Sequence, residues 1–136
     1  MPVSLAEIEK GHEFPPAEFE LTAEWVGQYI SAVRDESVRA LGPSVVPPMA
    51  VATLCIRTLL EQSTLPPGSI HAAQELEFER SVRIGDVLSA AARIVSRGER
   101  AGWVLLGVSL EATAGGARVM HGRAMLTFPA DPEAAN

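Results

Sequence analysis

The sequence predicts an α+β fold in which an antiparallel sheet wraps around one long buried helix. Two observations indicate this fold. Apolar residues recur with a helical period over residues 21–36 and 47–62, and then with a period of two from residue 70 onward. The second helical segment is also apolar on almost every side. Because the helices precede a run of strands, we expect them to pack on one face of a single sheet.

The first elements are a short strand over residues 17–22 (AEFELT) and a helix over residues 21–36. Thr22 can cap this helix. One apolar stripe follows the helix, formed by Trp25, Val26, Tyr29, Ile30 and Val33. Asp35 and Glu36 fall at its C-terminus, where the helix dipole disfavours anions, so a functional reason for Asp35 is worth seeking.

The second helix is expected over residues 47–62 (PPMAVATLCIRTLLEQ), with Pro48 at a first helical position, where its missing N–H costs nothing. Only Arg57, Glu61 and Gln62 are strongly polar in this segment. A helix that is apolar almost all round is typical of a buried helix.

Four long strands follow, over residues 69–86, 86–99, 102–116 and 117–128, joined by short turns such as Arg97-Gly98 and Gly115-Gly116. In the first of them Ile70, Leu76 and Phe78 share one face. His71 shares the other with Glu75 and Glu77. Such a sheet leaves an edge strand exposed, which favours pairing with a second copy.

Composition narrows the function. A net charge of −6 with scattered Lys and Arg argues against nucleic acid and against an anionic membrane surface. No apolar run approaches the ~20 residues of a membrane span, no signal peptide is readable, and Cys55 is the only cysteine. We therefore expect a cytoplasmic protein with one domain over residues 1–129 and a disordered tail over 130–136. The three histidines lack metal-ligand spacing, and no nucleotide-binding glycine motif is present, so neither a metal nor a cofactor is expected.

Three stretches resemble a known family: residues 11–22 (GHEFPPAEFELT), 45–54 (VVPPMAVATL) and 68–88 (GSIHAAQELEFERSVRIGDVL). They are similar to the MaoC-like dehydratases and (R)-specific enoyl-thioester hydratases, and most of all to the N-terminal branch of that family. The resemblance implies a hot-dog fold, usually in dimers or double hot-dogs. It also implies reversible addition of water to a 2-enoyl thioester of coenzyme A or acyl carrier protein.

Active members of the family carry an Asp-x-Asn-Pro-x-His segment after the first helix. By resemblance Asp35 is the catalytic Asp, whereas Ser37 stands in the Asn position and Ala40 in the His position. The central helix begins with PPMA where active hydratases usually have His-Gly. The N-terminal branch often forms the non-catalytic or acyl-binding half beside a catalytic hot-dog.

The resemblance also implies a substrate site. Amide groups near Met49 and Ala50, after Pro48, would hold the thioester oxygen as enolate charge develops, with Ser37 beside Asp35. His71 is either a solvated histidine on the glutamate face or a replacement for the missing histidine in the thioester pocket. Asp35 and Ser37 have an ordinary alternative as turn residues.

Two functions follow from these residues. The first is a 3-hydroxyacyl-thioester dehydratase or enoyl-thioester hydratase with a degenerate catalytic loop. The alternative is a non-catalytic subunit that binds the acyl chain or stabilises a catalytic partner, in a heterodimer instead of a homodimer. A thioesterase would require another carboxylate near the helix, and no residue is singled out for that role.

Overall fold

The computed structural model of the chain describes residues 2–34, 40, 42–131 and 133. Its elements, in chain order, are β1 (Val3–Ser4), β2 (Ala17–Glu20), α1 (Ala23–Val33), α2 (Pro48–Glu61), β3 (Ser63–Thr64), β4 (Ile70–Phe78), β5 (Val87–Arg100), β6 (Trp103–Ala114) and β7 (Ala117–Pro129). Five strands form an antiparallel sheet in the order β2-β5-β6-β7-β4, and β1 pairs with β3 in a small parallel ladder. The expected α+β architecture is confirmed. Most of the expected tail, residues 130–136, lies outside the described residues.

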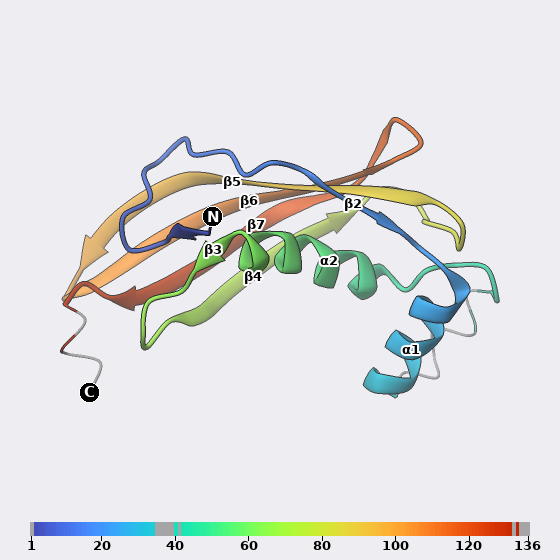
Figure 1. Cartoon of the computed structure of the whole chain (residues 1–136), viewed down its shortest axis with the longest axis horizontal. Coiled ribbons are helices and arrows are strands. Elements are labelled where there is room, and N and C mark those ends of the chain that lie inside the picture. The colour runs from blue at the N-terminus through green and yellow to red at the C-terminus, as the bar shows by residue number, and fades with distance from the viewer. Residues whose placement is uncertain (1, 35–39, 41, 132, 134–136) are drawn as a thin grey trace.

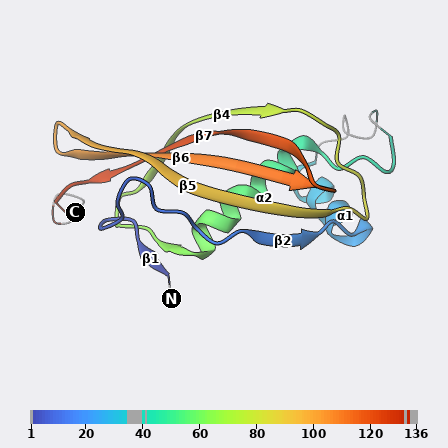
Figure 2. The ribbon, with the colours of Figure 1, turned by 90° about the horizontal axis from the view of Figure 1, so that it is seen from above.

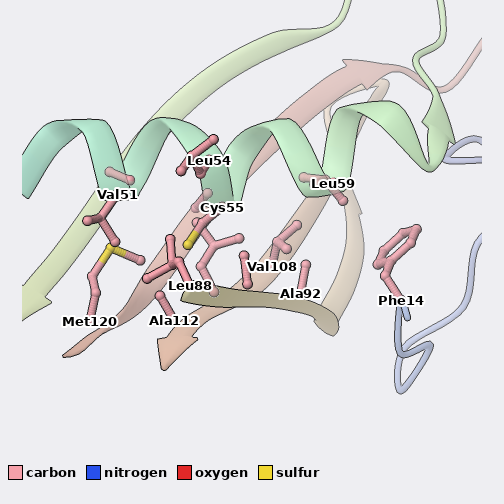
Figure 3. Close-up of a cluster of buried hydrophobic side chains, with 14 of the residues drawn as sticks. Phe14, Val51, Leu54, Cys55, Leu59, Leu88, Ala92, Val108, Ala112 and Met120 are labelled. Carbon is pink, nitrogen blue, oxygen red and sulfur yellow. The ribbon is translucent and has the colours of Figure 1, made fainter. Parts of the chain in front are cut away.

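The sheet curves over α2, which lies against its inner face (Figures 1 and 2). The helix packs on β5 and β6. Its buried side chains include Val51, Leu54, Cys55 and Leu59, and Figure 3 shows Val51 and Cys55 pointing toward side chains of the sheet. Alternation along β5 and β6 supplies that inner face, because every second side chain points toward the helix.

The covering of α2 is one-sided, which corrects the expectation of a helix buried all round. In the described chain Met49 is 50% exposed and Leu60 42% exposed, although both are large and apolar. The reason is that a single sheet can cover only one side of a helix. Among the described helices none is long and apolar enough to cross a membrane.

Helix α1 lies at the N-terminal end of α2 (Figures 1 and 2). Thr22 caps it as predicted, because its Oγ1 accepts the Trp25 N–H at 3.1 Å. The predicted apolar stripe is only partly covered: Val26 is buried, whereas Val33 is 48% exposed. The helix ends at Arg34 in the left-handed conformation, with φ 54°.

The sheet differs from the prediction at two places. The strand predicted over residues 69–86 is strand only as β4, Ile70–Phe78, and residues 79–86 connect it to β5. The second difference is in a turn. The predicted turn at Gly115-Gly116 is confirmed, with φ values of 60° and 78°. The predicted turn at Arg97-Gly98 is wrong, because β5 continues to Arg100. The chain reverses instead at Ala101 and Gly102, whose φ values of 52° and 84° suit a two-residue hairpin turn.

Candidate functional site

Two hollows lie between α2 and the edge strand β4, which runs in the opposite direction to the helix (Figure 1). The first, called here the N-terminal hollow, has a volume of about 350 Å³ and is lined by Val45, Val46, Pro48, Val51, Phe78, Glu79, Arg80, Ser81, Val82 and Val119. The second, called the side hollow, has a volume of about 360 Å³ and is lined by Met49, Ala52, Thr53, Ile56, Arg57, Leu60, His71 and Gln74. Both combine an apolar floor with a few polar side chains, the usual composition of a small-molecule site.

A β-bulge decides where His71 points. His71 pairs with Leu126 and Ala73 pairs with Met125, so Ala72 is the extra residue of β4. Because Leu126 belongs to the buried inner face, His71 also faces α2 and lines the side hollow. The prediction that His71 shares the face of Glu75 and Glu77 is therefore wrong. The alternative, in which His71 replaces the missing histidine in the thioester pocket, stays a prediction; the structure places the His71 side chain in the side hollow beside α2.

The N-terminus of α2 lacks a side-chain cap. Pro47 occupies the cap position without such a hydrogen bond, and Pro48 has no N–H to offer. The Ala50 N–H already donates to the Pro47 carbonyl at 2.9 Å. Met49 therefore carries the first amide hydrogen that a ligand at this end of the helix could use.

The chain before α2 is held in place by backbone hydrogen bonds. Val46 N–H donates to the Val82 carbonyl at 2.7 Å, and Ile84 N–H donates to the Ser44 carbonyl at 2.8 Å. Gly85 lies in the turn that follows, with φ 100°. These contacts hold the start of α2 against the residues that follow β4, and both segments line the N-terminal hollow.

Charged side chains border both hollows. Arg57 donates to Glu61 at 2.6 Å and lies 5.6 Å from the ring centroid of Phe19. Glu79 accepts from Arg118 at 2.8 Å. Its Oε1 also lies 2.5 Å from His121 Nδ1, although the approach is not aligned for a hydrogen bond.

The described residues contain no group of three side chains suited to hold a metal ion. Cys55 lies in the core and is fully buried. Burial raises the pKa of its thiol to about 12, which keeps the sulfur protonated and unsuited to act as a nucleophile.

The structure separates the predicted site residues. Pro48 lines the N-terminal hollow, whereas Met49 and His71 meet in the side hollow. Ala50 is fully buried and contributes its side chain to the core. Asp35 and Ser37 lie outside the described residues.

Sequence reasoning missed several residues of the hollows, among them Thr53, Gln74 and Arg80. One signal in the sequence could have identified the residues that α2 contributes to the side hollow. Met49, Thr53, Ile56 and Leu60 follow one another at helical spacing, so they form a second stripe distinct from the core stripe.

No family model matches the sequence, and no curated protein matches it. Solved structures do match the fold. An (R)-hydratase from A. caviae involved in PHA biosynthesis is 22% identical over 90% of this chain and 98% of that chain, with a TM-score of 0.73. A chain of the HadBC (3R-hydroxyacyl-ACP dehydratase) complex from Mycobacterium tuberculosis is 24% identical over 91% of this chain and 100% of that chain, with a TM-score of 0.73. A MaoC-like dehydratase from Rhodospirillum rubrum is 18% identical over 92% of this chain and 95% of that chain, with a TM-score of 0.71. The chain thus has the hot-dog fold of these dehydratases and hydratases, as its sequence predicted.

Proposed function

We propose that this chain is a MaoC-like protein that binds acyl thioesters of coenzyme A or acyl carrier protein and interconverts 3-hydroxyacyl and 2-enoyl thioesters. The observation that carries the proposal is the pair of apolar hollows on the open side of α2, at and beside the uncapped start of the helix. The hot-dog fold shared with an (R)-hydratase and with dehydratases supports it. A cytoplasmic location belongs to the same proposal.

Each part of the site has a task in the addition of water. A carboxylate, Asp35, activates or orients the water, with Ser37 beside it. The Met49 N–H donates to the thioester oxygen as enolate charge develops, helped by the positive end of the helix dipole. The apolar linings of the hollows take the acyl chain.

Assembly into a dimer is part of the proposal. β4 pairs with β7 on one side, and no strand of the described residues pairs with its other edge. Large apolar side chains gather near that edge and on the open side of α2, namely Met49, Leu60, Ile70 and Phe78, each exposed by 41 to 52%. A second hot-dog, identical or related, would satisfy the backbone groups of β4 and cover these side chains.

The test is hydration of crotonyl-CoA and longer trans-2-enoyl-CoAs by the purified chain. We expect hydration, and a loss of at least a hundredfold in kcat/KM for Asp35→Ala, the usual scale for an acid–base residue. Glu36→Ala is the matched control and should keep full activity. Undiminished hydration by Asp35→Ala would exclude the role given to Asp35.

A second candidate is a non-catalytic subunit, because Ala40 stands where the family has its histidine. One of the solved structures of this fold is a complex, HadBC. In this case the lone chain does not hydrate enoyl-CoA, and activity requires a second hot-dog protein with an intact Asp-x-Asn-Pro-x-His segment. Activity of a mixture that exceeds the sum of the separate proteins would favour this candidate.

A further inference from the structure

The free edge of β4 is built for a second copy of the same strand. All nine residues of β4 except Leu76 are exposed in the single chain. Two of them are large and apolar: Ile70 is 52% exposed and Phe78 41% exposed. Unpaired backbone groups beside exposed apolar side chains are the features that proteins bury by strand pairing. A strand that meets its own copy around a twofold axis pairs antiparallel, and the residue on the axis faces itself.

Charge excludes two residues from the axis. A register centred on Glu75 would place this carboxylate opposite its own copy, and one centred on Leu76 would place Glu75 opposite Glu77 twice. Like charges that lie directly opposite are destabilising. A register centred on Gln74, the middle residue of β4, avoids both clashes and pairs most of the strand. It places Glu75 opposite Ala73 of the partner subunit, and it lets the two Gln74 amides meet.

The bulge then determines what else is paired. On one side of Gln74 the paired residues are Ala73 and then His71, because Ala72 is the extra residue of the bulge. On the other side they are Glu75 and then Leu76. His71 of the partner subunit therefore lies opposite Leu76, on the face toward α2. Phe78 is the diagonal neighbour of this histidine, at a separation that an aromatic side chain can span.

Phe78 lines the N-terminal hollow at the start of α2, whereas His71 of the same chain lines the side hollow. We propose, on the basis of the thioester chemistry above, that His71 acts in trans, in the N-terminal hollow of the partner subunit. The dimer thereby supplies the histidine that Ala40 replaces. Each site is incomplete in one chain and complete in two.

The role of the imidazole is acid–base. The His71 imidazole takes one proton from water while the water oxygen bonds to C3 of the enoyl thioester. The electron pair of the C2–C3 double bond moves to the thioester oxygen, which the Met49 N–H holds. The imidazolium then returns its proton to C2. Water has been added, and no cofactor takes part in these steps.

Cysteine cross-linking tests the geometry without any activity. The native Cys55 is buried and is the only cysteine, so a new surface cysteine reports on its own position. Directly opposite residues of antiparallel strands have Cα atoms about 4.5–5.5 Å apart, within the range of a disulfide. We expect Gln74→Cys to form a disulfide-linked dimer in oxidising conditions.

Glu77→Cys is the matched control, because in this register it lies opposite Ile70 of the partner subunit, far from its own copy. It should stay unlinked. Cross-linking of Glu75→Cys with none in Gln74→Cys would overturn the register. A chain that sediments as a monomer would overturn the whole inference.

Subunit complementation tests the role in trans. His71→Ala removes the histidine, and Ser81→Trp, at an exposed residue that lines the N-terminal hollow, blocks that hollow. Each homodimer should show less than a few per cent of wild-type hydration. In the purified heterodimer, one site keeps an open hollow and receives His71 from the Ser81→Trp chain. We expect about half of wild-type activity there, and its recovery also shows that both variants fold.

A heterodimer as inactive as its parents would overturn the role in trans, since a histidine that acts within its own chain gains nothing from mixing. Failure of the proposed function has a different signature. In that case the wild type hydrates no enoyl-CoA, alone or with a second hot-dog protein, while the Gln74→Cys cross-link still forms. That result would remove the catalytic role of His71 and leave the dimer register standing.

Discussion

Gly122 on β7 lies directly against the Glu75 backbone of β4, so closely that an added side chain would have no room. A Cβ built on Gly122 overlaps the Glu75 carbonyl oxygen and comes within 2.8 Å of the Leu76 Cα. Both neighbours are backbone atoms of a paired strand, which cannot turn aside as a flexible side chain can. The absence of a side chain at Gly122 therefore sets how closely the edge strand can join the sheet.

Gly122→Ala should destabilise the fold by about 3 kcal/mol, near the upper end of the cost of overpacking, because β4 must move away from β7. Urea unfolding would measure the loss. The matched control is Gly27→Ala in α1, where a Cβ meets no atom within 4 Å and alanine has the better helix propensity. This control should gain up to about 1 kcal/mol. Equal effects of the two variants would contradict the crowding described at Gly122.

A second crowded glycine should behave differently. A Cβ at Gly107 collides with the Ser96 hydroxyl, a side-chain atom, while the next contacts, Ser96 Cβ and Val95 Cγ2, are at 3.5 and 3.6 Å. Gly107→Ala alone should cost about 1 kcal/mol or more, and Ser96→Ala in the same chain should relieve most of it. A double-mutant cycle of unfolding free energies measures this coupling. Additive losses would mean that the hydroxyl is not the obstacle.

The sequence predicted the long elements well because hydrophobic period reports burial directly. Both helices, the Thr22 cap and the Gly115-Gly116 turn lie where the pattern placed them. The prediction of a turn at Arg97-Gly98 was wrong because it rested on a glycine. The chain reverses instead at Ala101 and Gly102, and an alanine gives no sequence signal for a positive φ.

The candidate site was harder to predict, because it depends on a single inserted residue. Simple alternation puts His71 on the glutamate face, and only the pairing of β4 with β7 shows that Ala72 is extra. A bulge reverses the face of every residue beyond it, yet Ala72 has no distinctive local signature. The resemblance named Met49 and His71, which both line the side hollow, as candidate substrate-binding residues, but it gave no reason to name Thr53 or Gln74.

Arg97 anchors the N-terminal segment. Its guanidinium donates to three backbone carbonyls, those of Leu5 at 3.1 Å, Ala6 at 2.7 Å and Ile8 at 3.0 Å. Arg97→Lys keeps the charge but cannot span the three acceptors, so we expect a loss of about 2 kcal/mol. The Leu5 N–H, which donates to the Thr64 carbonyl, should exchange its hydrogen at least tenfold faster.

Arg100→Lys, at the exposed end of the same strand, is the control for Arg97→Lys. It should leave both the unfolding free energy and the exchange at Leu5 unchanged. If Arg97→Lys matches this control, the three hydrogen bonds do not hold the segment.

The buried thiol of Cys55 should make stability depend on alkaline pH. Its pKa is about 12 in the folded chain against 9.0 for an unburied cysteine, so the folded state holds the proton more tightly. The stabilisation is complete below pH 9 and is lost as the pH rises from 9 toward 12, where only the unfolded chain ionises. At pH 10.5 the loss should be on the order of 2 kcal/mol relative to pH 7.

Comparison with Cys55→Ala isolates this effect, because Tyr, Lys and Arg residues titrate alike in both chains. At pH 7 the variant should be less stable than the wild type, since removing the sulfur leaves a cavity under α2. Between pH 7 and pH 10.5 the gap in unfolding free energy should narrow or reverse, because only the wild type carries the thiol. Urea unfolding measures both free energies. If the difference between wild type and Cys55→Ala is the same at pH 7 and pH 10.5, the thiol ionises as readily in the folded chain as in the unfolded one.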